Sequence, residues 1–426
     1  MDFSMPEHFT STREVNLGPA TFLDCLAFCI FLAPQLIRQV GWVDTILCAL
    51  QALPFLLIHL PLSLIRERYP YLAPQRDGRN EEAKRRAFLQ SPQRASVFAD
   101  IVLQCVRYSF VHIPPRITRV FLSKEVALPY LEFRLLRNGY LGSPVPWGEV
   151  NENGLRGIWI THDPRTKPDI VIYYAHGGGF AAGSPYFYLE FLLTWVSVLR
   201  GAGYANPAIF ALEYTLVPDA TYPTQVDEAL KGYEHVLAEV KDPSIVVVGG
   251  DSAGATLMLC LLLRLGLGAD VEAEDWDRDN EEEGIVDPNA ADKKPALRLP
   301  KPALAVLISP WPTLVSDRYR NTAIDYLDAE QLCRDVSWWK RASPSKGVFV
   351  TYGTEEVLAP ETEMLVDMLK KAGALAGVEA VLGGIHVWPV AAMFLVRSKK
   401  DRIAGLVSVT RRIREHVPWY RIDRLG

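Results

Sequence analysis

The chain has 426 residues, which is more than one average domain, although α/β folds also reach this length. Its formal net charge is −5, and it has no basic patch of the kind that nucleic-acid-binding proteins present, so we expect no nucleic-acid partner. The six cysteines lack the spacing of a metal site, and a disulfide framework is not expected from their positions.

An apolar N-terminal region is expected over residues 1–125. Residues 45–65 form a run of 21 positions without Asp, Glu, Lys or Arg, which is long enough to cross the hydrocarbon core of a bilayer. Pro54 and Pro61 would kink a helix in this run, and membrane helices tolerate such kinks. A second run, residues 20–37, is apolar except for one aspartate.

Three interpretations of these apolar runs are open. They form a transmembrane anchor or hairpin, they lie in the membrane interface, or they are a buried pair of cap helices over an active site. Neither run has the form of a signal peptide, and the length of the runs favours association with a membrane. Seven basic residues between Arg66 and Arg86 favour the cytosolic side for the rest of the chain.

The remaining chain, residues 126–426, is predicted to form a second domain. From about residue 157 to 415, runs typical of strands alternate with runs typical of helices. This alternation predicts an α/β fold with a doubly wound, mostly parallel sheet.

A glycine-rich segment follows the strand-like residues 169–174. Residues 176–180 read H-G-G-G-F. Consecutive glycines leave backbone N–H groups close to whatever binds there, and such donors stabilise the oxygen that becomes negative during acyl transfer. We predict that Gly178 and Gly179 supply two donors of an oxyanion hole. The alternative is a glycine-rich turn without a ligand, which the next motif disfavours.

The next motif lies between a strand-like run, residues 244–249, and a helix-like run, residues 255–265. Residues 250–254 read G-D-S-A-G. A strand, a sharp turn with serine at its apex and a helix form the nucleophile elbow of α/β-hydrolases, and small residues are needed on both sides of that serine. We predict that Ser252 is the nucleophile and that the N–H of Ala253 is the third oxyanion donor.

Residues 268–300 interrupt the alternating pattern. Residues 270–283 contain nine acidic residues and one arginine, and such a stretch buries too little apolar surface to order itself. We expect a mobile surface insertion, with an acidic partner-binding loop as the alternative. Residues 317–340 predict a small helical insertion, whose aromatic side chains are expected to pack rather than to contact substrate.

An acidic residue is expected after the strand-like residues 347–352, because the triad of this fold runs in the order serine, acid, histidine. Glu355 and Glu356 both follow that run, so spacing alone does not choose between them. The apolar Leu358 two positions beyond Glu356 favours Glu356 as the carboxylate that orients the histidine.

The histidine must lie beyond Ser252, and of eight histidines only His386 and His416 do so. His386 lies in a loop after the strand-like residues 378–382, where an imidazole can reach the edge of the sheet. His416 ends a charged helical stretch, residues 411–416, and is expected on a solvated helix face. We predict that His386 is the general base.

Together these residues resemble the hormone-sensitive-lipase-like α/β-hydrolases, a family that includes arylacetamide deacetylase and the yeast steryl deacetylase. The resemblance covers residues 157–388. Its motifs are H-G-G-G-F at 176–180, E-Y-T-L-V-P at 213–218, Y-P at 222–223, G-D-S-A-G at 250–254, S-P-W at 309–311, Gly353-x-x-Glu356-x-Leu358 and His386. Family members usually carry Asp where this chain has Glu356.

The resemblance implies hydrolysis of short acyl esters, acetates above all, of lipophilic alcohols such as sterols, without a metal or cofactor. It also implies that the N-terminal part caps the pocket and that the protein resides in the endoplasmic reticulum. Some relatives face the lumen, so the side of the membrane is left open.

Two rival functions use the same motifs. An amidase, such as an aryl formamidase, shares the glycine-rich segment and the nucleophile motif but gives no reason for the apolar N-terminus. A non-catalytic hormone receptor of the same fold lacks the catalytic histidine, so His386 disfavours that interpretation.

Overall fold

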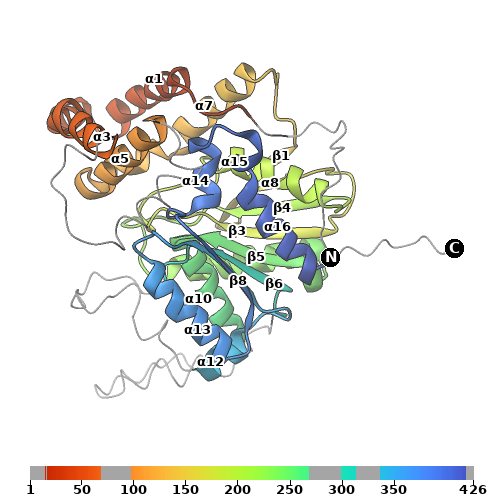
Figure 1. The fold of residues 1–426 in the computed structure, drawn as a ribbon. Coiled ribbons are helices and arrows are strands. Elements are labelled where there is room, and N and C mark those ends of the chain that lie inside the picture. Colours follow the sequence, from red (N-terminus) through yellow and green to blue (C-terminus); the bar gives the residue numbers. More distant parts are fainter. Residues whose placement is uncertain (1–14, 16, 69–96, 268–298, 313–335, 419–426) are drawn as a thin grey trace, which may run out of the picture.

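The structure is a computed structural model that describes residues 15, 17–68, 97–267, 299–312 and 336–418. One twisted sheet runs through the centre of the molecule with helices on both faces (Figure 1). The helices of the N-terminal part lie together on one side of this sheet-and-helix body.

The sheet has eight strands among the described residues, in the order β1-β2-β4-β3-β5-β6-β7-β8. β1 pairs antiparallel with β2, and β2 pairs antiparallel with β4, whereas every pairing from β4 through β8 is parallel. The strands are β1 (Trp147–Glu152), β2 (Leu155–Thr161), β3 (Ile170–Ala175), β4 (Pro207–Leu212), β5 (Val246–Asp251), β6 (Leu304–Ile308), β7 (Val348–Gly353) and β8 (Leu375–Val381). The prediction of a doubly wound, mostly parallel sheet is confirmed.

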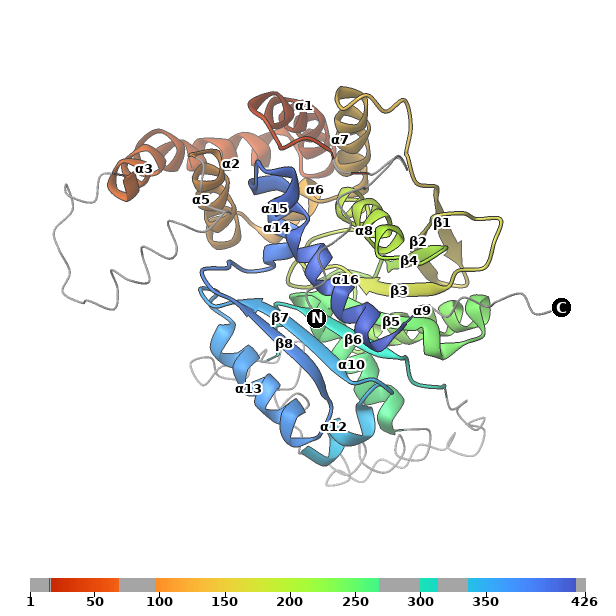
Figure 2. The ribbon, with the colours of Figure 1, turned by 45° about the vertical axis from the view of Figure 1, so that its right-hand side comes forward.

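Strands β3 to β7 are buried at every position, since helices cover both of their faces. This is why they read as nearly continuous runs of Val, Ile, Leu and Ala. One face packs against α9 (Thr224–Val240), α10 (Ala253–Leu267), α12 (Val336–Ala342) and α13 (Ala359–Lys371). The other face packs against α8 (Leu189–Gly201), α14 (Trp388–Leu395) and α16 (Ala404–His416), and the short α15 (Lys399–Arg402) joins the last two. Figure 2 shows these two layers on either side of the sheet.

The N-terminal helices form a separate group. They are α1 (Phe22–Gln39), α2 (Trp42–Pro54), the π-helical segment η1 (Phe55–His59), α3 (Leu60–Arg68), α5 (Val97–His112), α6 (Pro115–Phe121) and α7 (Lys124–Arg137). Two stretches of this group, Phe22–Gln39 and Trp42–Ile65, are long and apolar enough to cross a membrane. Only 17% of the first and 6% of the second is buried, so these helices are not the buried cap pair of the third interpretation.

The kink expected in the apolar run of residues 45–65 takes the form of a π-helical turn. The N–H of Leu60 donates to the carbonyl of Phe55, five residues earlier, between Pro54 and Pro61. Because Pro61 has no N–H, an α-helical bond from that position to Leu57 cannot form, and a locally widened turn is one way for a helix to accommodate this loss.

Helix α7 connects the N-terminal group to the rest of the molecule. It packs on α1, and its Leu131 and Leu135 also belong to the core formed with α8 and α16. The division of the chain into two domains at residue 125 therefore stays a prediction.

The acidic stretch of residues 268–298 and most of the helical insertion expected at residues 317–340 lie outside the described residues. Trp339 in α12 is buried in the main core, which agrees with a packing role.

Candidate active site

Ser252 stands at the apex of a sharp turn between β5 and α10. Its backbone has a φ of 50°, in the left-handed region that side chains other than glycine rarely adopt. The flanking glycines make the turn possible. A Cβ on Gly250 would lie 2.5 Å from the carbonyl carbon of Gly254, and a Cβ on Gly254 would lie 2.1 Å from the carbonyl oxygen of Ala175. The sequence therefore folds into the predicted elbow, with Ser252 half-buried.

His386 and Glu356 approach Ser252 from two other strands. His386 follows β8, and its Nε2 lies 3.0 Å from the Ser252 Oγ. Glu356 follows β7, and its Oε2 lies 2.6 Å from the His386 Nδ1. With the proton of a neutral imidazole on Nδ1, Nε2 is free to accept the serine proton. The structure thus brings the three predicted residues into one hydrogen-bonded chain.

The two adjacent glutamates have different surroundings. The Glu356 side chain is fully buried, whereas Glu355 is exposed to solvent. Only Glu356 contacts His386, as Leu358 suggested. Glu356 contacts the imidazole of His386 from inside the protein. Because the His386 side chain is 39% exposed, the opposite side of the ring is open to a substrate.

Ser309, at the end of β6, joins the acid to the histidine loop. Its Oγ donates to Glu356 Oε1 at 2.7 Å and accepts from the N–H of Val387 at 2.9 Å. The N–H of Gly353 also donates to Oε1. Ser309 belongs to the S-P-W motif, but the sequence analysis assigned it no role. Its position after a buried strand that neighbours the nucleophile strand is the signal that could have identified it.

The predicted oxyanion donors come from the loop after β3 and from the residue that follows Ser252. Gly178 and Gly179 have φ values of 120° and 62°, which favour glycine. Neither of their N–H groups donates to an acceptor within the described part of the chain. Ala253 opens α10, and the N–H groups of a first helical turn have no partner inside the helix. The three donors are therefore available to a negative oxygen.

Asp251 fixes the glycine-rich loop against the elbow. Its buried carboxylate accepts hydrogen bonds from the Tyr174 and Tyr188 hydroxyls, each at 2.7 Å, and from the Gly177 N–H at 2.9 Å. Burial raises the pKa of Asp251, against the opposing effect of these hydrogen bonds. The sequence showed this residue only as a member of the nucleophile motif. An acid at the end of a buried strand was the available signal for a positioning role.

His176 begins the glycine-rich loop and is buried. Its ring stacks on Tyr214, with ring centroids 4.4 Å apart, and its Nδ1 lies 2.8 Å from the Gly177 carbonyl oxygen. Burial lowers the pKa of His176 to about 4. The side chain is therefore neutral at physiological pH, with Nδ1–H donating to Gly177.

His416 lies far from this constellation. It ends α16, where its Nδ1 lies 2.8 Å from the Arg412 carbonyl oxygen, and it is part of the charged helix face that the sequence predicts. Among the described residues, no group of three or more His, Cys, Asp and Glu side chains is arranged to hold a metal ion.

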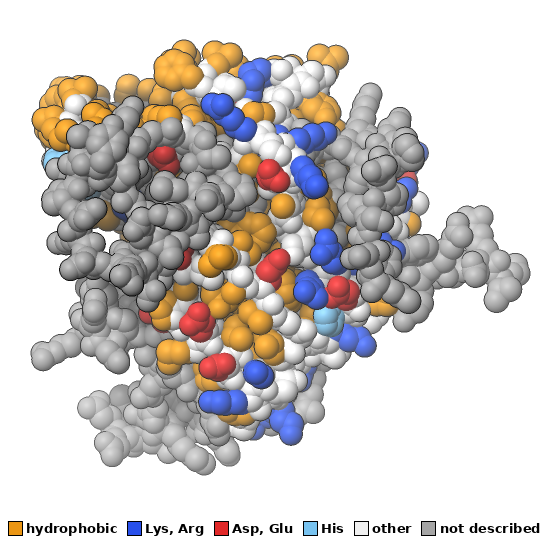
Figure 3. Space-filling model, in the orientation of Figure 1, with side chains coloured by type: hydrophobic (Ala, Val, Ile, Leu, Met, Phe, Trp, Pro, Cys, Tyr) orange, Lys and Arg blue, Asp and Glu red, His pale blue; other side chains and the backbone are white. Residues whose placement is uncertain are grey.

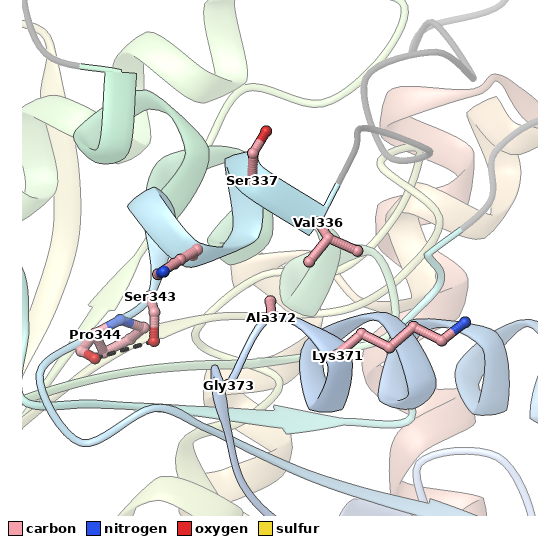
Figure 4. Close-up of a pocket in the computed structure, with 8 residues that line it drawn as sticks. Val336, Ser337, Ser343, Pro344, Lys371, Ala372 and Gly373 are labelled. Carbon is pink, nitrogen blue, oxygen red and sulfur yellow. Dashed lines mark hydrogen bonds between the residues drawn. The ribbon is translucent and has the colours of Figure 1, made fainter.

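One open cavity of about 680 Å³ lies between α12 and the end of α13 (Figure 4). It is lined by Val336, Ser337, Lys340, Ser343, Pro344, Lys371, Ala372 and Gly373. These residues come from α12, the start of the β7 segment and the end of α13, at the amino edge of the sheet. The catalytic candidates follow the carboxyl ends of β5, β7 and β8, where parallel α/β sheets bind their substrates. We therefore assign the cavity no part in the chemistry.

Comparison with known proteins agrees with this fold. Residues 172–390 match the family described as alpha/beta hydrolase fold. The chain is also similar to an acetyl-hydrolase of Streptomyces hygroscopicus, with 27% identity over 272 residues that cover 59% of this chain and 77% of that protein. It is 31% identical to an acetyl esterase of Salmonella schwarzengrund over 121 residues, 27% of this chain and a third (33%) of that enzyme.

Among solved structures, the chain is similar to an esterase from the bacterial hormone-sensitive lipase family. The two share 21% identity with a TM-score of 0.46, over 69% of this chain and 92% of that one. An esterase/lipase from an uncultured bacterium is 20% identical with a TM-score of 0.49, over 80% and 99% of the two chains. Identity this low says nothing of the substrate.

The family match spans the segment that runs from the glycine-rich loop to His386, and so includes every residue of the site described above. From this match over half of its length, the chain belongs to the alpha/beta hydrolase fold family, as a carboxylester hydrolase.

Proposed function

We propose that the protein hydrolyses short-acyl esters, acetates above all, through a triad of Ser252, His386 and Glu356. The observation that carries the proposal is the hydrogen-bonded chain of these side chains, at 3.0 Å and 2.6 Å. Acyl transfer by serine needs a base within hydrogen-bond reach of the hydroxyl, and a third group that orients the base.

In the proposed reaction, the Ser252 Oγ attacks the ester carbonyl carbon while its proton moves to Nε2 of His386. The bond between that carbon and the alcohol oxygen then breaks, and His386 returns the proton to the departing alcohol. Water attacks the carbonyl carbon of the resulting acyl-enzyme while His386 takes its proton. The bond between that carbon and the Ser252 Oγ then breaks, His386 returns the proton to Oγ, and the acid is released. The buried carboxylate of Glu356 stabilises the imidazolium that forms in each half of the reaction.

The carbonyl oxygen becomes negative in both tetrahedral intermediates. We propose that the N–H groups of Gly178, Gly179 and Ala253 receive it. Because Asp251 holds Gly177 in place, the donors are oriented before the substrate arrives, and this preorganisation is what makes such donors effective. Loss of one donor typically costs a hundredfold or more in turnover.

Three observations support a lipophilic acetate as substrate. Two of the relatives act on acetyl groups by name, as an acetyl-hydrolase and an acetyl esterase. The exposed apolar helices support association with a membrane, where lipophilic esters partition. The resemblance to steryl and arylacetamide deacetylases supports an alcohol such as a sterol, and a location in the endoplasmic reticulum.

A fluorophosphonate probe tests the nucleophile. We expect wild-type protein to be labelled on Ser252, and Ser252→Ala to lose both labelling and p-nitrophenyl acetate hydrolysis. Ser343→Ala, a serine outside the site, serves as the control and should keep both. If Ser252→Ala were labelled as strongly as wild type, another residue would be the nucleophile.

The adjacent glutamates provide a matched pair for the acid. Glu356→Gln should lower kcat by roughly a thousandfold or more, because a neutral amide no longer stabilises the imidazolium. Glu355→Gln should remain within about twofold of wild type, since that side chain is exposed and makes no contact with His386. The reverse order of the two effects would assign the acid to Glu355.

The amidase alternative is separated from esterase activity by paired substrates. We expect p-nitrophenyl acetate to be cleaved with a much higher kcat/KM than p-nitroacetanilide. A preference for the anilide, or for an aryl formamide, would favour the amidase. An acyl-enzyme burst with an activated ester would argue against a non-catalytic binding protein of the same fold.

A further inference from the structure

The N-terminal helices expose an unusual number of large apolar side chains. We define the N-terminal apolar surface as the outward faces of α1, α2, η1 and α3. Its most exposed members include Phe22, Leu26, Ile30, Trp42, Leu50 and Leu57. Leu57 is 70% and Trp42 65% exposed. In Figure 3 the hydrophobic side chains gather along the top of the molecule, over these helices. A monomer in water rarely leaves such a surface uncovered.

Helix α1 is held against the catalytic body by buried charges. Asp24 on its inner face is fully buried and lies 3.5 Å from a guanidinium nitrogen of Arg134, which is itself fully buried. Arg134 also pairs with Glu190 of α8 at 2.6 Å, and Arg137 pairs with Asp24 at 2.8 Å. Moving α1 away into lipid would break this cluster and leave buried charges unpaired. Only the outer face of α1 is therefore available to a bilayer.

The longer apolar run, Trp42–Ile65, also contacts neighbouring helices at its start and at its middle. At its start, Asp44 lies 3.1 Å from Arg116 of α6. At its middle, the Tyr108 hydroxyl of α5 donates to the Gln51 carbonyl at 3.1 Å, and its ring stacks on Phe55 at 4.2 Å between centroids. In a spanning helix, the middle of the run would lie at the bilayer centre, remote from the catalytic body. Here the middle lies against α5.

The charged residues next to the apolar surface are mostly basic, as in helices that lie in the membrane interface. Arg38, Arg107 and Arg116 are exposed on α1, α5 and α6. Of the acidic side chains described in α1, α2, α5 and α6, only Asp44 is partly exposed, and it pairs with Arg116. Glu125 and Glu132 are exposed on α7, which is not part of the surface. Basic residues around an apolar face match the anionic headgroups of a lipid surface.

We propose that the N-terminal apolar surface docks flat in one leaflet of a lipid bilayer, rather than spanning the bilayer. Its role in substrate capture rests on the proposed esterase function. Two helices that pack against those of the surface, α5 against α3 and α6 against α1, reach the two sides of the site. The Ser184 hydroxyl, after the glycine-rich loop, donates to the Leu122 carbonyl at 2.5 Å, and α5 packs beside α14, which follows His386. Docking would bring the site to the membrane surface, where lipophilic esters dissolve.

Vesicle flotation of the full-length protein tests the surface. With phosphatidylcholine vesicles that contain phosphatidylserine, Leu50→Asp/Leu57→Asp should bind at least about tenfold more weakly than wild type. The control is Leu141→Asp, because Leu141 is 98% exposed but lies outside the surface, and this variant should bind normally. Both variants should hydrolyse p-nitrophenyl acetate in solution as wild type does, which shows that they fold. Unchanged binding of the double variant would overturn the proposal.

The same proteins and vesicles test membrane docking independently of ester hydrolysis. Hydrolysis of a long-chain alcohol acetate dissolved in the vesicles should fall with binding in the double variant, whereas p-nitrophenyl acetate hydrolysis should not. If wild type cleaves neither ester but floats with the vesicles, the proposed function fails and the docking surface stands. If the double variant instead turns a wild-type dimer into a monomer in light scattering, and wild type does not float, the surface binds a second copy and the proposal is overturned.

Two added cysteines distinguish a flat segment from a spanning one. Gln39→Cys lies three residues before the longer run and Ile65→Cys at its end, and the 24 residues of that run span about 36 Å as a straight helix. Protein is bound to preformed vesicles, treated with a membrane-impermeant maleimide, and mapped by peptide mass spectrometry, so the native cysteines need no replacement. Flat docking predicts labelling of both positions before detergent. Labelling of one position only after detergent would show a span and overturn the proposal.

Discussion

Ser309 connects two residues of the site that come from different strands, and its hydroxyl is the connection. It donates to Glu356 and accepts from the backbone of Val387, next to His386. Its φ of 45° lies in the left-handed region, so glycine fits this backbone better than serine does. Ser309→Gly therefore removes the hydroxyl without adding strain.

We expect Ser309→Gly to lower kcat by roughly tenfold or more, because a hydrogen bond to a charged group contributes about 1.5–3 kcal/mol. KM should change little, since the hydroxyl acts through Glu356 and not on the substrate. The matched control is Ser408→Ala, which removes a serine that bonds Glu379 on the far strand β8 and should leave kcat unchanged. Equal losses in kcat and in thermal stability for both variants would indicate a merely structural role.

At the scale of single residues, the sequence indicated the proposed triad but not the residues that position it. The proposed nucleophile and the histidine followed from chain order and from the glycines that a sharp turn needs. Glu355 and Glu356 could not be separated, because a loop has no fixed period that turns one of two neighbours inward. Ser309 and Asp251 act through contacts across strands whose order in the sheet no local pattern reveals.

The elbow depends on how closely α10 approaches β3. Gly254 lies in the first turn of α10, where helix propensity alone predicts that Gly→Ala stabilises by up to about 1 kcal/mol. The added Cβ would lie 2.1 Å from the Ala175 carbonyl oxygen, an overlap that neither backbone can avoid without moving. The steric effect outweighs propensity, because overpacking of this kind typically costs 1–3 kcal/mol or more.

Gly254→Ala should therefore lower Tm by roughly 5 °C or more and reduce kcat, because Ser252 moves with the helix. Differential scanning calorimetry and p-nitrophenyl acetate kinetics measure the two effects. Gly148→Ala in β1 is the control: no atom lies within 4 Å of its added Cβ, so Tm should not fall. A Gly254→Ala protein as stable and active as wild type would contradict the close approach.

Most elements near the site could be predicted, because buried parallel strands read as unbroken apolar runs. The expected strands at 169–174 and 347–352 match β3 and β7 within one residue at each end. β1 had no such signal. Its sequence is W-G-E-V-N-E and four of its six positions are exposed, so it resembles a loop until β2 pairs with it.

For the whole molecule, His176 ties stability to pH. Burial holds its folded-state pKa at about 4, whereas an unfolded histidine titrates near 6.5. The unfolded state thus binds a proton that the folded state does not as pH falls below about 6.5. Stability is lost progressively from there and the loss levels off below about pH 4, reaching on the order of 3 kcal/mol.

Urea unfolding at several pH values measures this effect. The free energy of unfolding of wild type should fall more steeply between pH 6.5 and 4 than that of His176→Gln, which lacks the titrating group. The variant should be less stable at pH 7, since it loses the stack on Tyr214, but the gap should narrow on acidification. Parallel profiles for the two proteins would contradict the assignment.

The two gaps between β5 and β7 begin at opposite ends of the sheet. Leu267 ends α10, the helix that starts beside Ser252 and runs back along the sheet, and β6 starts where Leu304 pairs with Val247 near the beginning of β5. Leu267 and Leu299, which flank residues outside the described part of the chain, therefore lie toward the amino edge of the sheet, away from Ser252.

The later segment departs from the other edge. Pro312 follows β6, whose Ile308 pairs with Asp251 immediately before the nucleophile. Insertions and deletions at the first gap can thus accumulate between related enzymes, or carry an engineered reporter domain, without touching catalysis. Variation just after Pro312 starts beside the strand end that carries Ser252. Directed evolution of substrate preference should therefore begin there.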